Sequence, residues 1–202
     1  MDFTFSAEQE LLRDGLSKFL SGRYDLETSR AAAKSGAGWQ PDIWQSFAEE
    51  LGILGAALPE DVGGIGGGPV EVMLIAEALG HALVIEPYVD TAVVAAGLLL
   101  RSGSAVASRL LEEIASGTAI VALAAAEADC GDRWQDLQTT ASRNGDDWVL
   151  TGDKIMVMNA PLATHLLIAA RTDSGISLFL VDSSEPRAGL VVHDYRTVDD
   201  RR

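Results

Sequence analysis

Cysteine and basic residues are scarce in this chain of 202 residues. The single cysteine, Cys130, excludes a disulfide bond within the chain. Only 15 lysines and arginines stand against 30 aspartates and glutamates, which gives a formal net charge of −15. Such a charge repels phosphate backbones and anionic lipid headgroups across a Debye length of about 8 Å. We therefore expect neither nucleic acid nor a membrane as a partner.

Long hydrophobic runs and a secretory leader are also missing. The most apolar stretch, Val89 to Leu100, covers about twelve residues where a bilayer needs about twenty, which favours a buried core helix. No basic segment followed by an apolar one opens the chain, so we expect a cytoplasmic protein. With 48% apolar residues and 6 prolines, the composition is that of a globular protein.

Residues for metal binding and nucleophilic catalysis are sparse. The three histidines, His81, His165 and His193, lie far apart and lack the spacing of metal ligands, so no metal site is expected. Cys130 follows Asp129 and has further acidic neighbours, a setting that disfavours a reactive thiolate. These residue types therefore indicate no catalytic nucleophile.

Three carboxylates, Glu127, Asp129 and Asp132, follow an apolar run that begins at Thr118. Two of them held together in a dry site could perform acid–base chemistry. The other interpretation is a solvated acidic loop, which we favour on residue chemistry alone.

The first 117 residues have the pattern of five or six helices. Helix signals include a capping hydroxyl at Ser6 with Gln9 three residues later, a proline at position 41, and Gly117 as a C-terminal cap. The segment from Tyr24 to Trp39 carries no clear signal. Helices are expected at 6–22, 41–51, 69–83, 89–100 and 104–117.

A glycine-rich stretch runs from Leu58 to Pro69. Its glycines suit close backbone approach, yet it lacks the Lys-Ser/Thr ending of a phosphate-binding loop and the spacing of a dinucleotide-binding motif. We favour a tight connection between helices that lies against another segment.

The pattern changes at Thr118 to short runs rich in β-formers, separated by turn residues such as Asn144-Gly145. This is typical of an antiparallel sheet. We expect an α+β protein with a helical domain at residues 1–117 and a β domain at 118–202 that is incomplete at its C-terminal end. Strands are expected at 149–150, 155–158, 166–169, 176–181 and 189–192.

Four segments in order carry a resemblance to a known family: Leu58-Pro-Glu-Asp-Val-Gly-Gly64, Ala126-Glu-Ala-Asp-Cys-Gly-Asp132, Asp147-Trp-Val-Leu-Thr-Gly-Asp-Lys154 with Asn159, and Leu178-Phe-Leu-Val-Asp182. Together they resemble the first two domains of the acyl-CoA dehydrogenase family, over essentially the whole chain. The resemblance implies an N-terminal helical domain, a β-barrel-like middle domain and a C-terminal four-helix domain that this chain lacks.

The resemblance also implies a function. FAD and an acyl-CoA thioester are bound where the domains meet, and the reaction introduces an α,β double bond in fatty acid or steroid catabolism, with an electron-transfer acceptor as a further partner. The family's catalytic carboxylate belongs to the third domain, so no residue here is assigned that role. The chain alone is expected to be inactive.

The flavin-facing segments depart from the family pattern. The threonine that reaches the flavin is replaced by Ala126, and the serine near the pyrophosphate by Asp132. In the second segment, Met156 replaces the ring-stacking tryptophan and Met158 a threonine. Methionine still offers a soft apolar surface, but it cannot donate a hydroxyl hydrogen bond. The resemblance assigns cofactor contacts to Leu123, Ala125, Ala126, Gly131, Asp132, Met156, Val157 and Met158.

These joint replacements resemble the small subunits of heteromeric acyl-CoA dehydrogenases of the pimeloyl-CoA and steroid type. A homo- or hetero-oligomer with another such subunit is therefore expected. Two readings stay open: an FAD-dependent dehydrogenase, or a non-catalytic partner subunit that has lost its flavin site. A third would keep FAD but act as an oxidase or monooxygenase.

Overall fold

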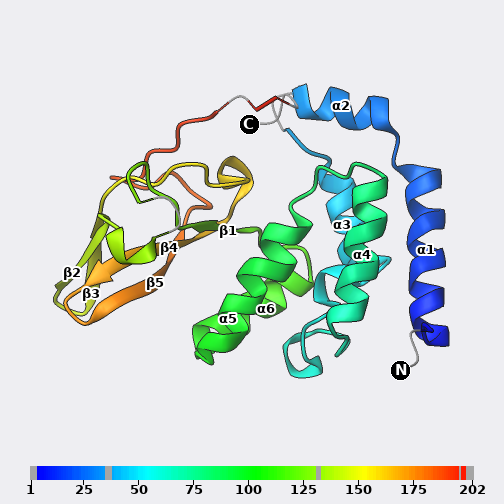
Figure 1. Ribbon diagram of the computed structural model, residues 1–202, viewed down its shortest axis with the longest axis horizontal. Coiled ribbons are helices and arrows are strands. Elements are labelled where there is room, and N and C mark those ends of the chain that lie inside the picture. Colours follow the sequence, from blue (N-terminus) through cyan, green and yellow to red (C-terminus); the bar gives the residue numbers. More distant parts are fainter. Residues whose placement is uncertain (1–3, 35–37, 131–132, 196, 199–202) are drawn as a thin grey trace. The chain divides into compact units, whose positions relative to one another are not determined.

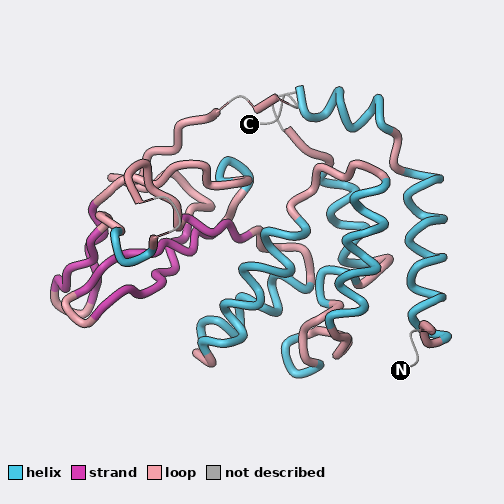
Figure 2. Tube along the Cα trace, viewed as in Figure 1, coloured by secondary structure: helices cyan, strands magenta, loops and turns pink. Residues whose placement is uncertain are grey.

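The computed structural model describes residues 4–34, 38–130, 133–195 and 197–198. They divide into two compact units, one built from the chain up to Ala119 with the last residues from Arg196, and one from Ile120 to Tyr195. Figure 1 and Figure 2 show that helices make up the first unit and strands the second. We describe each unit separately.

The helical unit is built around amphipathic helices whose apolar faces share one core. Ser6 caps α1 by accepting a hydrogen bond from the Gln9 backbone N–H at 3.2 Å, while the Gln9 side chain accepts one from the Ser6 N–H at 3.0 Å. Its helices are α1 (Ala7–Arg23), α2 (Leu26–Lys34), α3 (Pro41–Glu49), α4 (Pro69–His81), α5 (Ala96–Ser102) and α6 (Ala105–Ala115), with the 3-10 turns η1 (Ile53–Gly55) and η2 (Glu60–Val62) and the π-helix η3 (Val89–Ala95).

The core of this unit contains bulky apolar side chains from several helices. Phe47 and Ile75 are fully buried, and Trp44 of α3, which is also buried, donates from Nε1 to the Gly117 carbonyl at 3.0 Å. Gly117 has a φ of +76°, which confirms its predicted position just past the end of α6. The hydrogen bond from Trp44 therefore links α3 to the residue that follows α6.

Two parts of the helical unit differ from the prediction. The segment without a clear signal contains α2, and the apolar run expected as one α-helix begins as the π-helix η3 and continues as α5. Hydrophobic spacing does not distinguish i→i+4 from i→i+5 hydrogen bonding, so the sequence pattern missed this change. Among the described residues, no helix is long and apolar enough to cross a membrane.

The glycine-rich stretch forms the predicted tight connection. Gly66 N–H donates to the Leu58 carbonyl at 2.9 Å and Gly67 N–H to the Ala56 carbonyl at 2.8 Å, which folds the loop back on the preceding residues. A Cβ at Gly64 would lie 2.0 Å from the Leu58 oxygen, so only glycine permits this approach.

The second unit is a mixed sheet. Strand β4 pairs with β1 in parallel, with β2 in parallel at a single position, and with β5 in antiparallel, while β2 and β3 form an antiparallel hairpin. The unit contains β1 (Val121–Ala124), β2 (Thr140–Asn144), β3 (Asp147–Thr151), β4 (His165–Thr172) and β5 (Gly175–Asp182), with 3-10 turns η4 (Trp134–Asp136) and η5 (Ala160–Leu162).

The prediction of an antiparallel, barrel-like domain is wrong in two respects: the sheet contains parallel pairs, and within the described residues it does not close. Trp148 of β3 and Phe179 of β5 meet edge to face at 5.2 Å, so the sheet curves strongly although no ladder joins these two strands. The long segments after β1 and β3 explain the parallel pairs, because they let β1 and β2 run in the direction of β4.

Two of the predicted strands are absent. Residues 155–158 and 189–192 form no strand, although both are rich in β-formers. In the first of these segments Met156 has a φ of +51°, and Asn159, which directly follows the segment, has a φ of +60°; a strand does not accept these left-handed conformations. The segment is a loop held in a defined shape.

Candidate functional site

The described residues among the predicted cofactor contacts of the second unit, called the β unit below, lie at the end of β1, in the loop after β1 and in the loop after β3. Leu123 is half-buried in β1, Ala125 is partly buried just beyond it, and Ala126 is exposed. Gly131 and Asp132 lie outside the described residues. A backbone hydrogen bond of 3.0 Å from Ile155 N–H to the Ala126 carbonyl joins the two loops.

The second loop presents an apolar surface. Met156 is 73% exposed and Met158 is 45% exposed, while Val157 between them is half-buried. The backbone N–H groups of these three residues donate to no acceptor among the described residues. Two exposed thioethers therefore lie next to backbone N–H groups that have no acceptor among the described residues.

The backbone of this loop is strained at its most exposed residue. A left-handed φ at a residue with a Cβ costs free energy, and such residues concentrate at functional sites. Met156 adopts this conformation without being buried. The shape of the loop must therefore be imposed by the segments to which it is bonded.

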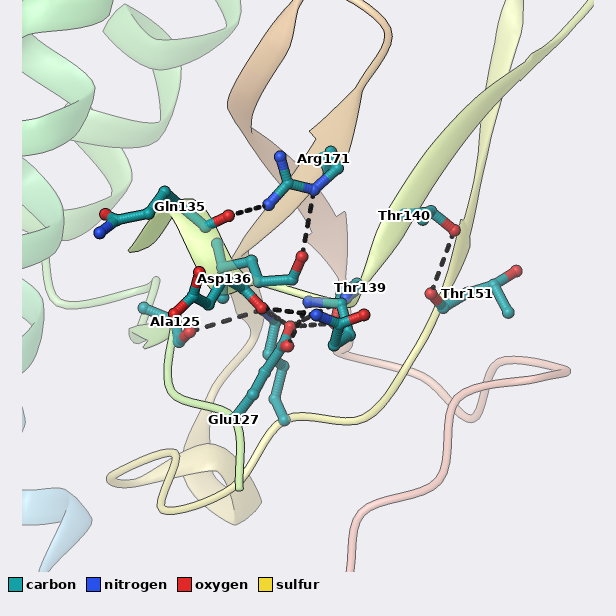
Figure 3. Close-up of polar contacts among 11 residues, drawn as sticks. Ala125, Glu127, Gln135, Asp136, Thr139, Thr140, Thr151 and Arg171 are labelled. Carbon is teal, nitrogen blue, oxygen red and sulfur yellow. Dashed lines mark hydrogen bonds and ion pairs between the residues drawn. The ribbon is translucent and has the colours of Figure 1, made fainter. Parts of the chain in front are cut away.

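A buried ion pair joins the two loops. Lys154 Nζ is 2.6 Å from Glu127 Oε1, and the two side chains are 9% and 6% exposed. The same oxygen accepts hydrogen bonds from Thr139 Oγ1 at 2.5 Å and Thr139 N–H at 3.0 Å, and Glu127 Oε2 accepts one from Gln138 N–H at 2.6 Å. Figure 3 shows Glu127 pointing toward Thr139 with these contacts as dashed lines. Both carboxylate oxygens are thus fully engaged.

The environment of Glu127 strongly favours its charged form. Desolvation by burial works to raise its pKa, but the hydrogen bonds from Lys154, Thr139 and the two backbone N–H groups outweigh it and lower the pKa to about 2. A carboxylate held in this way is a poor proton acceptor, because it stays ionised in any physiological buffer. Glu127 is a structural anion.

The prediction of a solvated acidic loop is therefore wrong for Glu127, which is buried, while Asp129 is exposed as expected. Asp132 lies outside the described residues. The partner of Glu127 is 27 residues further along the chain. No local pattern could reveal this pairing, so sequence reasoning missed Lys154 and Thr139 as members of the site.

The cysteine and the histidines considered in the sequence analysis are not among the members of the ion-pair site described above. Cys130 is buried and packs with Leu137 and Ala169 in a small apolar cluster. His165 contacts Thr164 through Nδ1 at 3.0 Å, and His81 and His193 are exposed. In the described part of the chain, no group of three or more histidine, cysteine or acidic side chains is arranged to hold a metal ion.

A helical unit followed by a unit built on a β-sheet is the domain order that the resemblance implies. Models of the acyl-CoA dehydrogenase N-terminal domain and middle domain match residues 6–118 and 122–200. Because the N-terminal model alone covers more than half of the chain, the chain belongs to the acyl-CoA dehydrogenase family.

Individual relatives agree with this assignment. The chain is 30% identical over 193 residues to acyl-CoA dehydrogenase FadE27 of Mycobacterium tuberculosis, covering 92% of this chain and 48% of that protein. A chain of the ChsE4-ChsE5 complex from Mycobacterium tuberculosis has a TM-score of 0.84 and 31% identity, over 98% of this chain and 52% of that chain.

A third comparison includes a bound cofactor. Glutaryl-CoA dehydrogenase from Mycobacterium smegmatis, solved in complex with FADH2, has a TM-score of 0.79 and 26% identity, over 90% of this chain and 47% of that chain. In all three comparisons the chain spans about half the length of the relative.

Proposed function

We propose that this chain supplies part of the flavin site of an FAD-dependent acyl-CoA dehydrogenase. The observation that carries the proposal is the pair of loops in the β unit, whose exposed methionines and free backbone donors lie at the positions that the family resemblance assigns to flavin contacts. Support also comes from the relative solved with FADH2. The reaction would introduce an α,β double bond into an acyl-CoA thioester.

The residues present fit such a cofactor. Met156 and Met158 would lie against the isoalloxazine ring, and the N–H groups at 156–158 would donate to its heteroatoms. Leu123, Ala125 and Ala126 would form the wall beside it. When bound, FAD would supply the acceptor for the hydride that leaves the β carbon of the substrate. The role of these side chains is to bind and orient the ring.

Removal of the proton from the α carbon requires a carboxylate, which the family resemblance assigns to the third domain. Glu127 is unsuited because its contacts lower its pKa to about 2. We propose that the base and the rest of the flavin site come from a further domain or from a partner subunit of the same family. The relative in the ChsE4-ChsE5 complex supports a hetero-oligomer. An electron-transfer protein would reoxidise the flavin.

A second candidate is a partner subunit that has lost its flavin. Ala126 and Met158 carry no hydroxyl at the positions where the family has threonine, and each lost hydrogen bond weakens binding by roughly 1 kcal/mol. The remaining contacts then decide whether FAD is retained. The two candidates differ in one observable, the presence of flavin at this chain's own site.

The test is the visible absorption spectrum of the protein as it is encoded in its genome, purified alone and together with a partner subunit encoded by a neighbouring gene. A yellow complex that bleaches on adding an acyl-CoA substrate supports the dehydrogenase. Replacement of Met156 with glutamate should then reduce the FAD content, because it puts a charge against the ring. A complex that is colourless under all conditions, or whose flavin content stays unchanged when Met156 becomes glutamate, favours the partner subunit.

A further inference from the structure

The Glu127–Lys154 pair has no part in the proposed chemistry, yet it is the most buried ion pair among the described residues. Burying two charges costs several kcal/mol unless every polar atom is satisfied, and an apolar pair of similar size is often as stable. Stability alone therefore gives little reason for this pair. Its geometry gives another, because it joins three segments that are distant in sequence.

The three segments are the loop after β1, the stretch before β2 and the loop after β3. Glu127 comes from the first, Thr139 and the Gln138 N–H from the second, and Lys154 from the third. Lys154 Nζ also lies 3.5 Å from the Ala125 carbonyl, so it contacts the first loop at two points. We call this set the clasp: Glu127, Gln138, Thr139 and Lys154.

The second segment is itself fixed to the sheet. Arg171 of β4 donates from its backbone N–H to the Thr139 carbonyl at 2.8 Å and from Nε to the Leu137 carbonyl at 3.2 Å, and its Nη2 reaches the Gln135 carbonyl. Figure 3 shows Arg171 extending toward Gln135. Through the clasp, both loops are therefore bonded to a segment that is itself hydrogen-bonded to the central strand β4.

The residues next to the clasp are the ones that face the proposed flavin. Ala125 and Ala126 directly precede Glu127, and Met156 follows Lys154 by two positions. The hydrogen bond from Ile155 N–H to the Ala126 carbonyl closes the connection and immediately precedes the left-handed Met156. Because Lys154 directly precedes the loop 155–158, its ion pair with Glu127 holds the start of this loop in place.

We propose that Glu127 and Lys154 are positioning residues that hold the loops 125–126 and 156–158 at one separation and orientation for the cofactor. The inference rests on the proposed flavin site and names the residues that preorganise it. Without the pair, Met156 relaxes from its left-handed conformation, and FAD must reorder the loop when it binds. Affinity for FAD should fall as a result.

The test uses the natural gene's product with its partner and two variants, Glu127→Gln and Lys154→Met. Each keeps much of the shape of its side chain but removes the ion pair. The measurement is the FAD dissociation constant from fluorescence titration of the apoprotein, at a temperature where every variant is folded by circular dichroism. Both variants should bind FAD at least tenfold more weakly. Thr139→Val, which removes one hydroxyl contact, should lose less.

The control is Leu166→Ala in β4, a buried core residue that pairs with Ala122 of β1 and Val181 of β5 and is not a member of the clasp. This variant destabilises the sheet unit but should bind FAD normally when folded. Variants of the pair that bind FAD as tightly as the parent, or an equal loss in Leu166→Ala, would overturn the positioning role. A parent complex without FAD would instead overturn the proposed function on which the inference rests.

A second readout needs no flavin. In the 202-residue chain, hydrogen exchange of the Ile155 amide reports whether the loop stays bonded to Ala126. Glu127→Gln should raise the exchange rate of the Ile155 amide by a factor at least tenfold larger than the factor by which it raises exchange of the β4 amides. Unchanged exchange at Ile155 would contradict the inference, even if a variant of the assembled complex failed to form.

Discussion

Acid should weaken the β unit through Glu127. The contacts in the clasp lower its pKa from the ordinary 4.5 to about 2, which corresponds to about 3 kcal/mol of stability. Because the folded pKa lies below the unfolded one, this stability is fully present above about pH 5. It is lost as the pH falls toward 2, where the carboxylate takes up a proton in the folded state as well.

Glu127→Gln removes the titrating group and leaves the Lys154 ammonium buried without its anion. The variant should be less stable than the parent by about 3 kcal/mol at pH 7, within the range measured for breaking buried pairs. Near pH 2 the two proteins should be almost equal. The difference between them is therefore expected to shrink across the interval from pH 5 to pH 2.

The assay is hydrogen exchange of a peptide covering β4, because this strand reports the opening of the β unit alone. The matched control is Asp129→Asn, which changes an exposed carboxylate of the same loop and should alter stability by less than about 0.5 kcal/mol. If Glu127→Gln and the parent lose stability in parallel between pH 5 and pH 2, the carboxylate does not stabilise the unit and the reasoning is refuted.

Three further changes test other parts of the structure. Gly152→Ala should destabilise the β unit by about 2 kcal/mol or more in urea unfolding, because Gly152 has a φ of +150° and its Cβ would lie 2.5 Å from Thr139 Oγ1; Gly175→Ala, at a φ of +130° but in open space, should cost less. Gly15→Ala, in the middle of α1 with nothing near its Cβ, should stabilise the helical unit by about 0.5–1 kcal/mol, seen as a higher melting temperature. Burial raises the pKa of Glu86, so its contribution is present below about pH 4.5 and is lost as the pH rises through the folded pKa; Glu86→Gln should gain stability relative to the parent between pH 4 and pH 8, and a constant difference would contradict this.

The glycine-rich loop and most of the helices could be predicted because their signals are local. Pro41 begins α3, Ser6 and Gln9 form a capping box, and Gly117 follows α6, each within a few residues of the element that it limits. The short helix α2 lacked such signals and was missed.

The sheet unit was less predictable because its structure depends on contacts between distant residues. The segment 155–158 has strand-forming residues, but the hydrogen bond to Ala126 and the clasp at Lys154 hold it as a loop. Parallel pairing of β1 with β4 likewise joins residues more than 40 positions apart. Composition favoured a solvated Glu127, and only the fold shows that a lysine and a threonine enclose it.

The most direct test of the account is the flavin content of the natural gene's product purified with its partner. The account predicts visible flavin bands that bleach with an acyl-CoA substrate, and a stoichiometry that falls when Met156 becomes glutamate. A complex that contains flavin only at the partner's own site, with no change in the Met156 variant, would contradict the claim that this chain forms part of a flavin site.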